Sequence, residues 1–183
     1  MKQKPLVFVI QYHQTVRKHY DFRLEIGGTM PSWAVPKGLT LDNTKKRLAM
    51  KVPDHDLEYR KFEGVLPEGK YGAGPVIIWD EGEYIPEVEE RVKDSEIQRV
   101  KGTKSQRDKG SEVQRVKVID RDEGERVMEE GLKKGEIKFE LKGKKVKGSF
   151  ALVKAKGFGG PNAWLLIKHK DKYVKPDYDA NNY

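Results

Sequence analysis

The chain has 183 residues, a formal net charge of +8 and no cysteine, and hydrophobic and charged residues each make up 36% of it. This length predicts one domain over residues 1–183, and the excess of positive charge favours a polyanionic partner. The lack of cysteine excludes disulfide scaffolds, thiolate metal sites and thiol nucleophiles. Because no apolar run reaches about 18 residues and no signal-peptide pattern precedes the first strand, we expect a cytoplasmic protein without a membrane partner.

Short segments rich in β-branched and aromatic residues alternate with clusters of Gly, Pro, Asn and Asp, a pattern typical of strands joined by turns. The predicted strands, in chain order, are Leu6–His13, Tyr20–Ile26, Ser32–Val35, Arg47–Val52, Pro75–Trp79, Glu136–Leu141, Lys147–Val153 and Trp164–His169. Many short strands of this kind predict a mainly β fold. They favour a closed or partly open antiparallel barrel, or a sandwich, over alternating βαβ units.

The second predicted strand alternates strictly between ionisable and apolar side chains. Successive side chains of a strand point to opposite faces, so His19, Asp21, Arg23 and Glu25 share one face. The intervening aromatic and aliphatic residues form the other face, which is typical of a core-facing surface. The ionisable face therefore places an imidazole, a carboxylate and a guanidinium next to one another.

A hairpin is expected to bring a second histidine to this face. The five residues Gln14–Lys18 connect the first two strands, and a tight loop there places His13 close to His19 and Asp21. Two imidazoles and a carboxylate from adjacent strands suit a divalent transition metal such as manganese, zinc or cobalt. Arg23, farther along the same face, would hold a phosphate in a bidentate manner.

His55 is the next candidate. It follows Pro53 and lies between Asp54 and Asp56, a pattern that predicts a loop position beyond a strand. Flanking carboxylates favour the protonated imidazole, which would suit phosphate binding or general-acid catalysis. Tyr59 offers a hydroxyl four residues later. Considered alone, these residues fit an exposed loop histidine equally well.

The middle of the chain differs from both ends. Residues 85–138 contain no aromatic residue, and residues 87–130 hold 11 basic and 13 acidic side chains, which leaves a net +10 for the rest. Ser95–Lys101 recurs sixteen residues later as Ser111–Lys117. We interpret residues 87–122 as a charged insertion, either a long hairpin or a disordered loop. It would be a solvated excursion or an arm that binds nucleic acid or protein.

One helix and one further histidine complete the survey. Glu123–Lys134 predicts a short amphipathic helix with Val127, Met128 and Leu132 on its apolar side. His169, at the end of the last predicted strand, is expected to lie on the surface.

The chain also carries a series of short motifs in a fixed order. They are Gln11-Tyr-His13, His19-Tyr-Asp-Phe-Arg-Leu-Glu25, Ser32-Trp-Ala-Val-Pro-Lys-Gly38, Asp54-His55, Phe62-Glu-Gly64, Pro67-Glu-Gly69, Tyr71-Gly-Ala-Gly74, Phe139-Glu-Leu141, Ala151-Leu-Val-Lys154 and Trp164-Leu-Leu-Ile-Lys-His169. This series resembles the 3′-phosphoesterase domain of bacterial DNA ligase D and its stand-alone archaeal and bacterial relatives. The resemblance covers about residues 1–86 and 135–175.

The resemblance implies a small β-barrel with its site in a crescent groove. It also implies a manganese-dependent hydrolase, with Co²⁺ or Zn²⁺ as alternatives, that trims DNA 3′ ends for repair or ligation. Members remove a terminal 3′-ribonucleotide and then the remaining 3′-phosphate, which leaves a 3′-hydroxyl. In ligase D, charged residues before the first strand assist ribonucleotide removal. This sequence has five residues there, so we expect phosphate removal to be favoured.

Residue by residue, the resemblance implies that the metal ligands are His13, His19 and Asp21. It implies that Arg23 and His55 bind the scissile phosphate and that Tyr59 is a supporting active-site tyrosine. It implies accessory polar or basic groove residues at Gln11, Lys37 and Arg47. The expected partners are DNA 3′ ends, a separate ATP-dependent DNA ligase and a polymerase or primase. A non-catalytic DNA-binding or ligase-recruiting module, and the same chemistry on RNA ends, are the alternatives.

Overall fold

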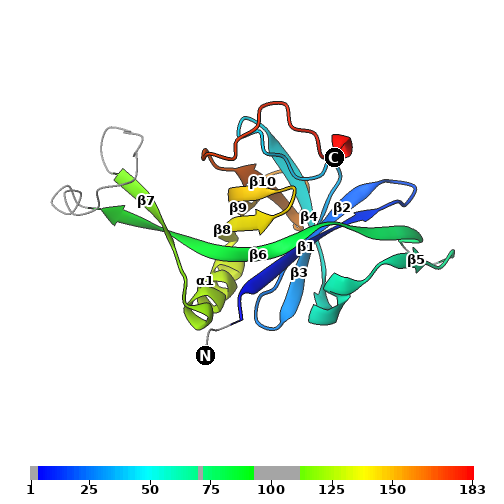
Figure 1. Ribbon diagram of the computed structural model, residues 1–183, viewed down its shortest axis with the longest axis horizontal. Coiled ribbons are helices and arrows are strands. Elements are labelled where there is room, and N and C mark those ends of the chain that lie inside the picture. Colours follow the sequence, from blue (N-terminus) through cyan, green and yellow to red (C-terminus); the bar gives the residue numbers. More distant parts are fainter. Residues whose placement is uncertain (1–3, 70–71, 93–111) are drawn as a thin grey trace.

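The computed structural model describes residues 4–69, 72–92 and 112–183 (Figure 1). Its strands are β1 (Leu6–His13), β2 (His19–Leu24), β3 (Thr29–Val35), β4 (Lys46–Asp56), β5 (Gly64–Leu66), β6 (Gly74–Val92), β7 (Glu112–Lys117), β8 (Glu136–Gly143), β9 (Lys147–Lys154) and β10 (Ala163–Lys168). The described helices are α1 (Arg121–Lys134) and two short 3-10 turns, η1 (Leu57–Lys61) and η3 (Ala180–Asn182).

Eight strands form a closed antiparallel barrel. They follow the order β1-β2-β3-β4-β10-β9-β8-β6, and β1 pairs with β6 to complete the circle. Closure leaves the barrel strands without free edges, except where a strand runs beyond its neighbours. The predicted mainly β barrel with one short helix is therefore confirmed.

Aromatic side chains fill the barrel. The ring centroid of Phe22 lies 6.3 Å from that of Phe8 and 5.8 Å from that of Phe139. Trp33 contacts Trp164 edge to face, at 5.8 Å. Among the described residues, none between 87 and 122 belongs to this buried hydrophobic cluster. The absence of aromatic residues in the middle of the sequence therefore reflects its position outside the barrel.

The strand predicted at Pro75–Trp79 is much longer in the structure. β6 pairs with β1 over its first half and with β8 from Gly82 to Glu87, and its final residues pair with β7. The described ends of the predicted insertion are thus a hairpin that extends away from the barrel (Figure 1). The second copy of the repeat lies mostly in β7, and the first copy, Ser95–Lys101, lies outside the described residues.

Helix α1 begins two residues earlier than predicted because Asp120 caps it. The Asp120 side chain accepts a hydrogen bond from the Glu123 backbone N–H, and Gly135 ends the helix with a φ of 85°. Met128 is buried against the barrel, as the apolar pattern of the helix indicated. No helix in the described part of the chain is long and apolar enough to span a membrane.

Replacing Asp120 with alanine is expected to lower the free energy of unfolding by about 1 kcal/mol, because the Glu123 N–H then loses its partner. Urea titration followed by circular dichroism measures this change. Asp120→Asn, which retains a capping oxygen, is the matched control and should stay close to the wild type. Equal losses in the two variants would contradict the capping role.

Candidate metal centre

The β1–β2 hairpin brings the three predicted metal ligands together. Its loop is the expected five residues long, and His13 lies directly opposite His19 in the register. The Nδ1 atom of His13 lies 3.7 Å from Asp21 Oδ2, and the Nε2 atom of His19 lies 3.5 Å from Asp21 Oδ1. One ligand atom from each residue falls within 4.8 Å of the other two, so a single cation can contact all three.

Two backbone carbonyls determine which ring nitrogen each histidine presents. His13 Nε2 lies 2.7 Å from the Gly72 carbonyl, and His19 Nδ1 lies 2.9 Å from the Arg17 carbonyl. A carbonyl only accepts hydrogen bonds, so each of these nitrogens carries a proton. The lone pairs of His13 Nδ1 and His19 Nε2 therefore remain free on the side of Asp21. Metal-binding histidines in proteins are commonly oriented in this manner.

Burial further favours neutral His13. The pKa of His13 lies below its usual 6.5, chiefly because burial disfavours the imidazolium, and His19 adds to the effect. A neutral imidazole is the form that binds metals. The electrostatic environment of the hairpin thus suits cation binding at neutral pH.

Arg23 links this cluster to His55. Its guanidinium is almost fully buried and contacts Asp21 Oδ2 at 3.2 Å, and its Nε donates to Gln11 Oε1 at 2.7 Å. Burial lowers the pKa of Arg23, but a guanidinium still remains charged at neutral pH. Its Nη1 lies 3.0 Å from His55 Nδ1. Arginine has no acceptor, so His55 Nδ1 accepts this bond and Nε2 carries the proton of the neutral ring.

Two expectations about His55 were wrong. It lies within β4 rather than in a loop, because that strand continues past Val52 after a shift in its pairing with β3. The pKa of His55 lies below 6.5, because burial and the Arg23 charge disfavour protonation more strongly than Asp21 and, to a smaller extent, Asp54 favour it. Asp54 itself forms an ion pair with Lys51, so a positive charge beside it offsets its effect on the imidazole.

Tyr59 extends the site as an aromatic layer on η1. Its ring centroid lies 4.5 Å from that of His55, and Arg23 Cζ lies 5.0 Å from the same centroid. Phe62 stacks on Tyr59, with centroids 5.1 Å apart and planes 15° apart. Gln11 holds this layer, since its Nε2 donates to the Tyr59 and Phe62 carbonyls at 3.1 and 2.9 Å.

The accessory residues predicted from the motifs differ in their positions. Gln11 is fully buried, so its described contacts are with Arg23 and the backbone of η1 and the residue after it. Lys37 is exposed beyond β3, and Arg47 is half-buried in β4. Among the described residues, no hydrogen bond or ion pair joins Lys37 or Arg47 to the cluster, and their groove role stays a prediction.

A family model for the DNA ligase D 3′-phosphoesterase domain matches residues 11–154, which contain this whole cluster. The chain belongs to this family. It is 39% identical over 166 residues to the multifunctional non-homologous end joining protein LigD of Pseudomonas aeruginosa. The matched residues make up 91% of this chain and 15% of that protein. The corresponding protein of Mycolicibacterium smegmatis is 36% identical over 171 residues, 93% of this chain and 18% of its own length.

A shorter match is closer in sequence. The LigD DNA repair protein of Mycobacterium tuberculosis is 57% identical over 77 residues, or 42% of this chain. This chain spans less than a fifth of the length of each of these relatives. The comparisons therefore concern one domain of larger multifunctional proteins.

His169, expected on the surface, is half-buried directly after β10. Its Nδ1 lies 2.8 Å from Ser149 Oγ, and Ser149 donates in turn to Glu87. Burial, together with the charge of Arg115, lowers the pKa of His169 to about 4. No local pattern indicates this burial, because the residues around His169 come from β6, β7 and β9.

Stability is expected to fall as the pH is lowered from about 6.5 to about 4, in part through His169. In this range the unfolded chain binds a proton at its ordinary pKa of 6.5, whereas the folded imidazole stays neutral. The stabilisation is therefore complete above pH 6.5 and lost toward pH 4. Urea titrations at pH 7.5 and 5.0 should show a smaller pH-dependent difference for His169→Gln than for the wild type. An unchanged difference would show that His169 does not contribute.

Proposed function

We propose that this protein is a metal-dependent phosphoesterase that acts on DNA 3′ ends, where it removes a 3′-phosphate and also a terminal 3′-ribonucleotide. The observation that supports the proposal most directly is the convergence of His13, His19 and Asp21 beside Arg23 and His55. Membership of the 3′-phosphoesterase family supports the type of reaction. An intact donor set would be unnecessary in a non-catalytic DNA-binding module.

The donor set fits a divalent transition metal. Asp21 supplies a carboxylate that is only 10% exposed, and the two histidines offer lone pairs beside it. Two histidines and one carboxylate leave coordination positions free for substrate, and manganese is our first candidate, with cobalt and zinc as alternatives. When bound, such an ion would supply Lewis-acid stabilisation of the phosphoryl group and a more acidic water.

The other residues would bind and orient the phosphate. Arg23 is held by three partners, so its charge is preorganised for the non-bridging oxygens of a phosphoryl group. His55 is held at Nδ1, which leaves its Nε2–H as a donor to the same group. Tyr59 packs against both residues and limits their movement. In this arrangement no side chain is required as a covalent nucleophile.

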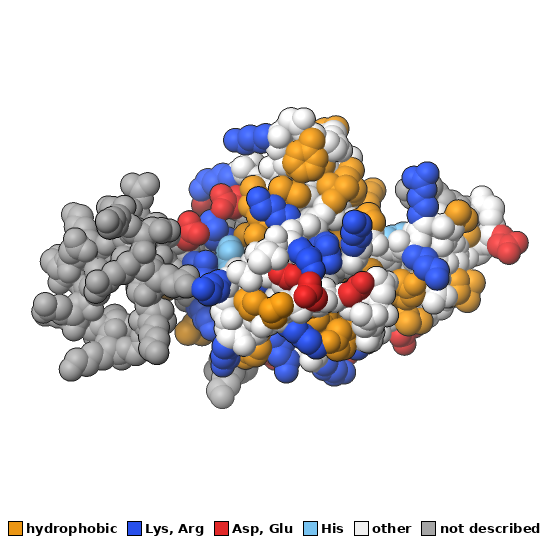
Figure 2. Space-filling model, turned by 90° about the horizontal axis from the view of Figure 1, so that it is seen from above, with side chains coloured by type: hydrophobic (Ala, Val, Ile, Leu, Met, Phe, Trp, Pro, Cys, Tyr) orange, Lys and Arg blue, Asp and Glu red, His pale blue; other side chains and the backbone are white. Residues whose placement is uncertain are grey.

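The surface charge supports a nucleic-acid substrate. Lysine and arginine side chains are spread over the face seen in Figure 2 and outnumber the carboxylates there. With a net charge of +8 for the whole chain, binding to a DNA backbone would release counterions and depend little on base sequence. The 3′-hydroxyl product would be a substrate for a DNA ligase or polymerase, the partners that we propose for end joining.

The direct test uses a primer–template with a 3′-phosphate, incubated with the protein and manganese. The expected product is a 3′-hydroxyl end, detected by its altered mobility on a denaturing gel and by its extension with a polymerase. Parallel arms with a single 3′-ribonucleotide on DNA and with a 3′-phosphate on RNA define the substrate range. A protein that is folded and metal-loaded yet inactive on every substrate would refute the proposal.

Two histidine variants make this test specific. His19→Ala removes one expected ligand and should abolish product formation. His169→Gln alters the histidine outside the site and should retain activity at pH 7.5. Binding of DNA that is indifferent to metal and to His19→Ala, without product, would instead support the binding-module alternative.

A further inference from the structure

Beyond Glu87, strand β6 has a described neighbouring strand on one edge only. This residue pairs with Lys117 of β7 on one edge and with Lys138 of β8 on the other. From Val88 to Val92, β7 is the only described strand that pairs with β6. In the described part of the chain, the edge on the β8 side therefore carries backbone N–H and C=O groups that no strand pairs with, which is where an added strand can bind.

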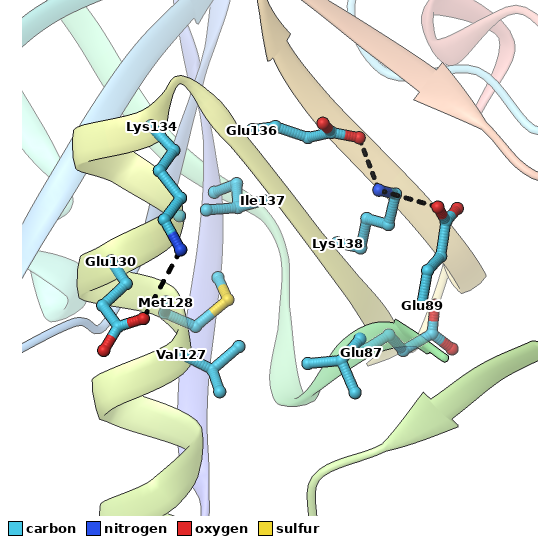
Figure 3. Close-up of a pocket in the computed structure, with 11 residues that line it drawn as sticks. Glu87, Glu89, Val127, Met128, Glu130, Lys134, Glu136, Ile137 and Lys138 are labelled. Atoms are coloured by element: carbon cyan, nitrogen blue, oxygen red, sulfur yellow. Dashed lines mark hydrogen bonds and ion pairs between the residues drawn. The ribbon is translucent and has the colours of Figure 1, made fainter. Parts of the chain in front are cut away.

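A cavity of about 350 Å³ lies at this fork, where β6 and β8 diverge and α1 passes beside them. Its floor is apolar. Met128 and Ile137 are buried there, and Val127 is half-buried beside them (Figure 3). Val88 of β6 also lines the cavity and is half-buried. A cavity of this size and lining suits one or two large aliphatic side chains.

The rim of the cavity is acidic, in contrast to the chain as a whole. Two ion-pair groups border the floor, Lys134 with Glu130, and Lys138 with both Glu89 and Glu136 (Figure 3). Besides the buried Glu87, the lining contains three glutamates and two lysines. A net negative rim on a chain of net charge +8 repels a nucleic-acid backbone and attracts basic groups.

We propose that this fork is a docking site for an extended segment of a partner protein, with one large apolar side chain flanked by lysine or arginine. The segment would pair with the free edge of Val88–Val92, insert its apolar side chain over Met128 and Ile137, and place its basic side chains near Glu89 and Glu136. Strand addition supplies affinity through the backbone, and the cavity and rim supply specificity. A two-stranded hairpin gains stability from a third strand, which further favours this occupant.

The fork and the metal centre lie at opposite ends of β6. His13 pairs with Val76 near the start of the strand, and Val88 lies twelve residue steps farther on, up to about 40 Å of extended chain. A docked partner would thus leave the metal centre accessible. Docking and catalysis should be separable in experiments, and the failure of one proposal does not entail the failure of the other.

The test selects random nine-residue peptides displayed on phage against the immobilised full chain, after depletion on the Val127→Glu variant. Enriched peptides should carry a central large aliphatic residue with flanking Lys or Arg. In fluorescence polarisation their affinity should fall by at least about 10-fold for Val127→Glu and for the double variant Glu89→Lys/Glu136→Lys. Glu123→Lys, on the exposed face of α1, is the matched control and should bind normally. Thermal melts establish that each variant is folded.

Two further measurements distinguish the occupants. Bound peptide should slow amide hydrogen exchange in Val88–Val92 and leave phosphate removal from a short DNA substrate unchanged. The proposal is overturned if no peptide is enriched or if the enriched peptides are acidic. It is also overturned if Val127→Glu and Glu89→Lys/Glu136→Lys bind the peptides as tightly as the wild type does. Self-association through the fork, seen as a dimer that Val127→Glu abolishes, would also overturn it in favour of a second copy of the chain.

Discussion

Replacing Asp21 with asparagine is expected to lower the rate of 3′-phosphate removal by at least about 100-fold, at a manganese concentration that just saturates the wild type. Among the described residues, Asp21 is the only carboxylate of the cluster, and it contacts His13, His19 and Arg23 at once. The amide keeps the shape but removes the negative charge. A cation would then face two neutral rings and the Arg23 guanidinium. Loss of a hydrogen-bond partner of a metal ligand typically lowers metal affinity or activity by about 10- to 100-fold, and loss of the charged ligand itself should weaken metal binding more.

The same variant should lose its thermal response to metal. We expect manganese to bind the folded wild type and not the unfolded chain, and therefore to raise the wild-type melting temperature. This rise should be absent in Asp21→Asn. Asp122→Asn, the same change at an exposed position in α1, should keep both the activity and the rise. If Asp21→Asn retains activity within a few-fold of the wild type, the proposed ligand set is incorrect.

Replacing Arg23 with lysine should lower kcat by about 100-fold, with a smaller effect on KM. The lysine keeps a positive charge but cannot reproduce the planar contacts of a guanidinium with Gln11, Asp21 and His55 at the same time. His55 Nδ1 would then lose its donor, and its ring would be free to reorient. Steady-state kinetics on the 3′-phosphate substrate separate the two parameters.

The control for this substitution is Arg126→Lys. Arg126 is exposed on α1 and forms ion pairs with Glu123 and Glu130, so its replacement should leave kcat unchanged. Circular dichroism of both variants checks that the barrel remains folded. Near wild-type kcat in Arg23→Lys would mean that positive charge alone accounts for phosphate binding, without the planar guanidinium of arginine.

The candidate ligands could be predicted from the sequence because the pattern that carries them is local. Strict alternation places His19, Asp21 and Arg23 on one face of a strand whatever the rest of the chain does. A five-residue loop then positions His13 opposite His19. His55 was predicted less well. Its position depends on the length of β4 and a pairing shift against β3, which no local pattern indicates.

Protonation states also required the folded chain. The Gly72 carbonyl that orients His13 is 59 residues away, and the Arg23 guanidinium that contacts His55 is 32 residues away. The flanking carboxylates suggested a protonated His55. Burial and Arg23 reverse this preference, since desolvation outweighs charges that remain in contact with solvent or with lysine.

The sequence by itself determined the mainly β character, the absence of thiolate chemistry and the three residues that can hold a metal. These follow from composition and from a period of two residues, which are properties of short segments. Only the tertiary structure decided the length of β6, the tautomers of the histidines, the burial of His169 and the fork beside α1. These depend on closure of the barrel, which brings distant segments together and removes water from between them.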